Sequence, residues 1–150
     1  MSLESKPDAY CGLYCGSCPV FTKTTAAVAA GKTDFSNPEG FCLGCKSEVV
    51  SGWCAECTLK SCARGKGYDT CAECPDYPCE PVKGFVEAAD WLYHIETPYN
   101  IALIKKEGKA AWLEHQKNRW SCPGCAAEQD WYSKTCASCG REQRGYDKKA

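Results

Sequence analysis

Cysteines are the residues of this chain whose type and spacing are best suited to chemistry, because there are 15 of them in 150 residues. Twelve form six C-x-x-C pairs, at 15/18, 42/45, 54/57, 71/74, 122/125 and 136/139. Two thiols separated by two residues can direct both sulfur atoms at one tetrahedral metal ion. The pattern predicts metal binding, with these candidate ligands: Cys11, Cys15, Cys18, Cys42, Cys45, Cys54, Cys57, Cys62, Cys71, Cys74, Cys79, Cys122, Cys125, Cys136 and Cys139.

A disulfide framework is the alternative use of so many cysteines. The odd count argues against it, and the N-terminus lacks the charged segment and apolar stretch of a secretory signal. No apolar run approaches the roughly 18 residues of a membrane span. We therefore expect a cytoplasmic protein without a membrane partner, in which reduced thiols bind metal.

The last four cysteines form the most specific motif, "CPGCAAEQDWYSKTCASCGRE". Its two pairs lie ten residues apart, and Gly140 follows the final cysteine where a positive φ lets backbone amides turn toward sulfur. Trp131 and Tyr132 are expected to cover the metal or to offer a partner an aromatic surface. The motif predicts a zinc ribbon that forms a separable contact module, with basic residues in and beyond it: Lys134, Arg141, Arg144, Lys148 and Lys149.

An internal repeat relates "CAECTLKSCARGKG" from Cys54 to "CAECPDYPCEPVKG" from Cys71, at an offset of 17 residues. Two such units facing each other could bind one ion, but their sequences leave two ligand sets open: Cys54, Cys57, Cys71 and Cys74, or Cys57, Cys62, Cys74 and Cys79. A separate site is expected from Cys15, Cys18, Cys42 and Cys45.

If the repeat uses the ligand set that begins with Cys54, three of the eleven N-terminal thiols belong to no predicted site: Cys11, Cys62 and Cys79. If they met on one ion beside His94 or water, the open coordination position would suit catalysis or redox sensing. The alternative is that they are buried thiols or members of regrouped sites. His94 and His115 are each possible ligands, although an isolated histidine on an amphipathic helix is more often simply solvated or hydrogen-bonded.

Zinc and iron–sulfur clusters both use cysteine thiolates. The spacing C-x3-C-x2-C from Cys11 also occurs in radical S-adenosylmethionine enzymes, but this chain is too short for their barrel. Cys18-Pro19 matches the end of a ferredoxin motif, yet the full order C-x2-C-x2-C-x3-C is absent. Three sets of four cysteines predict about three zinc ions. An iron–sulfur redox or electron-transfer protein is the alternative.

The elements that must position these thiols fall into four segments. Residues 9–80 form a cysteine-rich multi-zinc domain, in which metal replaces a missing apolar core by supplying roughly 10–16 kcal/mol per structural zinc. Residues 81–120 form a helical segment packed on it, residues 121–141 the ribbon, and residues 142–150 a basic tail. We expect a small α+β fold organised by metal.

Local signals place the helices. The alanine-rich stretch 19–30 predicts one helix that ends at Gly31. Residues 82–93 predict a second from the apolar spacing of Val82, Phe85, Val86, Ala89 and Tyr93. A third helix is expected to begin with a Thr97 cap and Pro98 at its first position, with Ile101 and Ile104 on its buried side. A fourth helix is expected over 109–120, after Gly108, with one stripe formed by Trp112, Gln116 and Trp120.

The order of motifs resembles an uncharacterised prokaryotic cysteine-rich family, catalogued as a domain of unknown function, in its longer form with an appended ribbon. The motifs are "CGLYCGSC", "CLGC", "WCAECTLKSCARGKGYDTCAECPDYPC" and "GKAAWLEHQKNRWSCPGC". The resemblance covers about residues 9–140 and includes all eleven cysteines from Cys11 to Cys79. It implies metal binding, with zinc the expected ion, and implies no activity.

The net charge of the chain indicates which kinds of partner it could bind. The formal net charge is -1 and the sequence pI is near 6.1. This argues against a protein that holds nucleic acid mainly by neutralising phosphates. We find no catalytic set of residues, which favours a zinc-binding interaction or regulatory module with a protein partner, while a zinc or redox site with catalytic or sensing function stays as an alternative.

Overall fold

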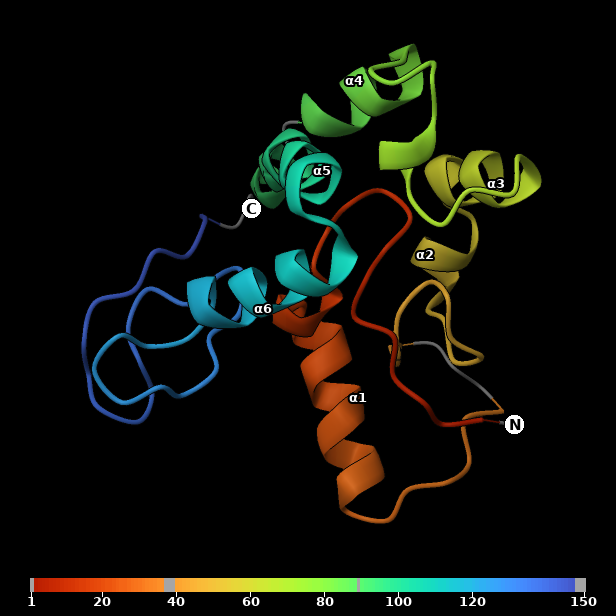
Figure 1. Cartoon of the computed structure of the whole chain (residues 1–150). Helices are drawn as coiled ribbons and strands as arrows, with labels where there is room; N and C mark the ends of the chain where they lie inside the picture. The colour runs from red at the N-terminus through yellow and green to blue at the C-terminus, as the bar shows by residue number, and fades with distance from the viewer. Residues whose placement is uncertain (1, 37–39, 89, 148–150) are drawn as a thin grey trace.

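The computed structural model describes residues 2–36, 40–88 and 90–147, with only the backbone of Trp53. Within these ranges the chain is mostly helical (Figure 1), and β pairing is limited to three isolated bridges, Asp8–Tyr14, Ser121–Glu128 and Thr135–Glu142. The β part of the predicted α+β fold is therefore not confirmed. The helices are α1 (Pro19–Ala29), α2 (Gly52–Ala55), α3 (Thr58–Gly65), α4 (Glu80–Val86), α5 (Glu96–Glu107) and α6 (Lys109–Arg119), with 3-10 turns η1 (Cys15–Ser17), η2 (Cys71–Glu73) and η3 (Leu92–Ile95).

Helix α1 confirms the helix predicted for residues 19–30. Pro19 occupies its first turn, where a missing N–H costs nothing, and Gly31 follows its end with φ +100°. Thr24 is fully buried on α1, and its hydroxyl oxygen accepts a hydrogen bond of 2.8 Å from the amide of Cys42. The helix thereby holds the Cys42–Cys45 turn in place.

The helices between residues 80 and 119 differ in part from those that the sequence predicts. Helix α4 stops at Val86, and the turn η3 begins only at Leu92, so the predicted helix over 82–93 is interrupted; Ala89, which belongs to that prediction, lies outside the described residues. Helix α5 starts at Glu96, so Thr97 lies inside its first turn and is not the cap that the sequence suggested.

Helices α5 and α6 meet at Gly108, whose φ of +86° separates them as predicted. The stripe predicted on α6 is confirmed, because Trp112, Gln116 and Trp120 are all buried. Gln116 donates to Asn100 of α5 (3.1 Å), and Asn100 donates to the carbonyl of Gly12 (2.8 Å). This buried chain of amides fixes both helices against the first cysteine loop.

One hydrophobic core joins segments far apart in the sequence. It combines Leu13 of the first cysteine loop with Leu59 of α3 and Val82 of α4, and it also includes Ile101 and Trp131. Trp131, which lies between the two cysteine pairs of the ribbon, thus belongs to the same core as the first cysteine loop and α3. A smaller cluster contains Phe35, Leu43 and Val49. None of the described helices has the length and apolar character needed to cross a membrane.

Candidate metal centres

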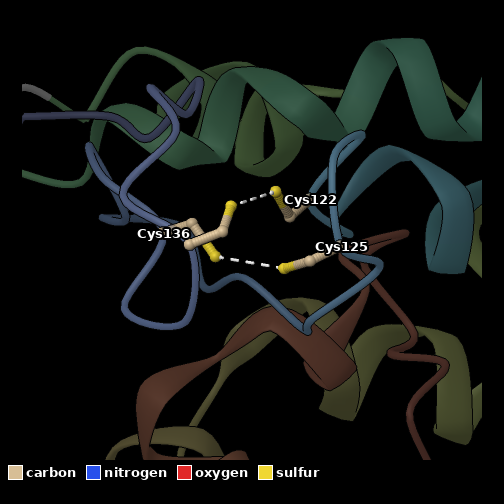
Figure 2. Close-up of side chains that lie close together, drawn as sticks. Cys122, Cys125 and Cys136 are labelled. Carbon is tan, nitrogen blue, oxygen red and sulfur yellow. Dashed lines mark hydrogen bonds between the residues drawn. The ribbon is translucent and has the colours of Figure 1, made fainter.

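The four thiols of the ribbon come together as the sequence predicts. The sulfur atoms of Cys122, Cys125, Cys136 and Cys139 all lie within 4.8 Å of one another. Figure 2 shows the labelled side chains of Cys122, Cys125 and Cys136 directed into one space; the Sγ–Sγ distances are 3.5 Å for Cys122–Cys139 and 3.6 Å for Cys125–Cys136. A zinc–sulfur bond of about 2.3 Å places tetrahedral sulfur atoms about 3.8 Å apart. The set therefore fits one metal ion.

The backbone shapes the two halves of this site in the same way. In each half, the first cysteine donates its amide to the carbonyl five residues on and accepts a hydrogen bond from the amide four residues on. Residues Ala126 and Gly140 complete these turns with φ of 65° and 78°. The bonds are Cys122 to Ala127 and Ala126 to Cys122 in one half, and Cys136 to Arg141 and Gly140 to Cys136 in the other, at 2.8 or 2.9 Å.

Two glutamines extend this symmetry beyond the ligands. Gln129 lies seven residues after Cys122 and donates to Sγ of Cys136 at 3.4 Å, while Gln143 lies seven residues after Cys136 and donates to Sγ of Cys122 at 3.3 Å. Sequence reasoning missed both residues. The signal was a 14-residue repeat, in which "SCPGCAAEQDWYS" is followed by "TCASCGREQRGYD" with the glutamines in register.

Hydrogen bonds change the pKa values of the ribbon thiols. Burial acts to raise the pKa of Cys122, but the amides of Cys125 and Gly124 and the thiol of Cys139 offset it and lower that pKa to about 6. The backbone amide of Cys139 is the main cause that lowers the pKa of Cys136. The thiolate is the form that binds metal, so a lowered pKa favours ligation by these two residues. For Cys125 the amide of Ala127 acts to lower the pKa, but a hydrogen bond with Cys136 and burial raise it to about 12.

Seven N-terminal cysteines influence one another's pKa values, and we call them the inner thiol group. Cys71 interacts with two of them, Cys11 and Cys57, and no three sulfur atoms of the group lie within 4.8 Å of one another. Burial raises the pKa of Cys11, and the thiols of Cys45 and Cys57 raise it further. A hydrogen bond with Cys54 lowers the pKa of Cys42 to about 6. The group contains the predicted set of Cys15, Cys18, Cys42 and Cys45 together with Cys11, Cys54 and Cys57.

The remaining four cysteines line a cavity of about 200 Å³ between α3, η2 and α4. They are Cys62, Cys71, Cys74 and Cys79, which we call the cavity thiols. This combination takes one thiol from the first repeat unit and three from the second, so it differs from both ligand sets that the repeat suggested. The described residues that line the cavity include neither Cys11 nor His94, which the sequence had placed as possible companions of Cys62 and Cys79.

The two histidines have other contacts. His94 is buried, its ring stacks on Phe85 with centroids 3.7 Å apart, and its Nδ1 lies 2.9 Å from the carbonyl oxygen of Phe85. Burial lowers the pKa of His94, which favours the neutral ring. His115 lies 3.2 Å from the hydroxyl of Tyr99. These contacts are those of structural histidines.

The fold and its four-thiol site define a small, cysteine-rich and mostly helical protein with a centre able to hold a metal ion. Residues 8–84, just over half of the chain, match the family model described as "Protein of unknown function (DUF3795)", and the chain belongs to that family. The matched region contains all eleven N-terminal cysteines and confirms the resemblance read from the motifs. Comparison with the curated proteins gives no match, and neither does comparison with the solved structures.

Proposed function

We propose that the ribbon binds one structural zinc ion and that the protein serves as an interaction or regulatory module. The observation that supports this most directly is the approach of four ribbon thiols to within 4.8 Å of one another. Four protein ligands close the tetrahedral sphere of zinc and leave no position for substrate, as in structural sites. The zinc would hold the two halves of the ribbon as one rigid surface.

A protein is the partner that we favour. With a net charge of -1, the chain has no excess of positive charge for neutralising phosphates. Lys134 of the ribbon pairs with Asp147 at 2.9 Å, and Trp131 is buried with its ring stacked on Tyr93, 4.0 Å between centroids. In this fold Trp131 is covered and offers no stacking platform to a base. Lys148 and Lys149, which belong to the predicted basic tail, lie outside the described residues.

Zinc analysis of a ligand variant tests the proposal. Cys136→Ser should lower the zinc content by one ion per chain and leave the metal of residues 11–79 in place. Ser138→Ala is the matched control, because Ser138 is exposed in the same turn and is not a ligand. Elemental analysis of both purified variants gives the answer, and a Cys136→Ser protein with the full zinc content of the wild type would overturn the ribbon site.

A binding titration tests the choice of partner. Fluorescently labelled single-stranded and double-stranded oligonucleotides should show no saturable binding to the zinc-loaded protein at physiological salt. Tight binding that weakens steeply with salt would instead assign the ribbon to nucleic acid.

A further inference from the structure

The cavity between α3 and α4 is walled by thiols and apolar side chains. Cys62 comes from α3, Cys71 and Cys74 from η2 and the residue after it, and Cys79 precedes α4. Leu59, Ala63 and Val82 line the same cavity and are buried; Tyr68, Tyr77 and Pro81 complete its mainly apolar wall. Four thiols from neighbouring elements thus line one space, which the adjacent apolar side chains leave unfilled.

The size of this space argues against a single zinc ion. A zinc tetrathiolate brings its sulfur atoms about 3.8 Å apart and encloses no void. Among the described residues, only the ribbon has three or more candidate ligand atoms within 4.8 Å of one another, so no three cavity thiols meet that condition. The cavity volume of about 200 Å³ exceeds the roughly 150 Å³ of an engineered protein cavity that binds benzene.

We propose that Cys62, Cys71, Cys74 and Cys79 bind a four-iron, four-sulfide cluster in this cavity. Such a cluster takes one cysteine thiolate on each iron, and its inorganic core keeps the four thiolates farther apart than one zinc ion does. Four thiols line the cavity, one for each iron, and no three of their sulfur atoms lie within 4.8 Å of one another. The site is independent of the zinc in the ribbon.

The polar surroundings of the cavity suit an anionic cluster. Lys66 lines the cavity with its Nζ 3.9 Å from Sγ of Cys74, and Asp76 holds the same ammonium group at 3.4 Å. The ammonium group is a cation beside a thiol of the proposed site, and the Asp76 carboxylate, which also lines the cavity, balances part of its charge. Cys62 is exposed, so one edge of the cluster would lie at the molecular surface, as is suited to exchange of electrons with a partner protein.

Composition of the wild-type chain provides the first test. Protein produced with ample iron and purified without air should be brown and contain equal amounts of iron and acid-labile sulfide, close to four of each per chain, together with zinc. Protein that holds zinc but no iron and no sulfide under these conditions would overturn the proposal.

Variants then locate the cluster. Cys71→Ser should lose iron, sulfide and visible absorption while keeping the ribbon zinc, and Cys122→Ser should show the reverse. If Cys122→Ser loses zinc but Cys71→Ser keeps all of its iron and sulfide, the proposed function stands and the cluster site is wrong.

A variant that keeps every thiol tests the cluster site even if Cys71→Ser does not fold. Ala63 is buried at the cavity wall, so Ala63→Leu adds apolar volume where the cluster would sit. We expect this variant to fold, to retain the ribbon zinc and to lose iron and sulfide. Ala110→Leu makes the same change at an exposed position of α6 and should keep the cluster. Full iron and sulfide content in Ala63→Leu would place the cluster elsewhere and contradict the proposal.

Discussion

Gln129 and Gln143 each present an amide N–H to a ribbon sulfur atom that belongs to the other half of the site. A zinc-bound thiolate keeps negative charge, and hydrogen bonds to it stabilise that charge and fix the direction of the ligand. Since the two bonds cross, each glutamine also joins one half of the ribbon to the other. At the scale of single residues, the donors around the metal are therefore part of the site.

Replacing these donors should weaken zinc binding without removing a ligand. We expect Gln129→Ala and Gln143→Ala each to lower zinc affinity by about 10–100-fold, the usual effect of losing a group that supports a metal ligand. Competition with a chromogenic chelator measures the affinity. Glu142→Ala, at the exposed residue beside Gln143, is the control and should bind zinc like the wild type. Equal affinities in all variants would show that the sulfur contacts contribute nothing.

At the scale of elements, the ribbon is tied to α5 and α6 through a buried carboxylate. Glu96 of α5 is 4% exposed and receives hydrogen bonds from Arg119 Nε (2.8 Å) and Nη2 (3.0 Å) of α6. The hydroxyl of Tyr146, beyond the ribbon, also donates to Glu96 at 2.7 Å. Burial and this carboxylate raise the pKa of Tyr146 to about 12, so the hydroxyl keeps its proton at neutral pH.

Removal of that hydroxyl should loosen the ribbon from the helices and leave the metal site intact. A hydrogen bond to a charged group contributes about 1.5–3 kcal/mol, so Tyr146→Phe should lower the free energy of unfolding by about that amount. Denaturant titration of zinc-loaded protein measures the loss, and the chelator assay should show unchanged zinc affinity. Arg144→Ala, at an exposed residue nearby, serves as the control. If stability stays at the wild-type value, the contact with Glu96 does not hold the ribbon.

The elements also show what the sequence could predict. Helix α1 and the boundary between α5 and α6 follow from local signals at Pro19, Gly31 and Gly108, whose backbone preferences act wherever they occur. The ribbon was predictable because its ligands are close in the sequence. The break after Val86 was not predictable, because the apolar spacing continues through it; in the structure His94, after the break, stacks on Phe85 and contacts its carbonyl oxygen.

Which N-terminal thiols lie together also depends on tertiary packing and not on the local sequence. The two repeat units share seven of 14 residues, including all three cysteines, yet Cys54 of the first interacts with Cys42, whereas its counterpart Cys71 lines the cavity. A local pattern assigns equal roles to equivalent positions. In the structure these equivalent positions have different neighbours, and neither predicted set of ligands coincides with the cavity thiols.

At the scale of the whole molecule, four charges join the N-terminal loop, the Cys42–Cys45 turn, the repeat and α6. Lys46 contacts Asp8 at 2.7 Å and Asp69 at 2.9 Å, and Lys109 contacts the same carboxylates at 3.4 Å and 3.1 Å. The side chains of Lys46 and Asp8 are each 10% exposed, whereas that of Lys109 is 45% exposed. The inner pair is thus shielded from water and the outer contacts are not.

This difference in exposure makes the two lysines a matched pair for experiment. Lys46→Met should lower the free energy of unfolding by more than about 1 kcal/mol, because it removes the shorter and better shielded contact of Asp8 and leaves only the Lys109 contact at 3.4 Å. Lys109→Met removes a half-exposed partner of the same carboxylates and should cost less than about 1 kcal/mol. Denaturant titrations of both variants with metal bound give the comparison. Equal losses would mean that Lys46 gains nothing from its burial and that the whole network acts as a surface cluster.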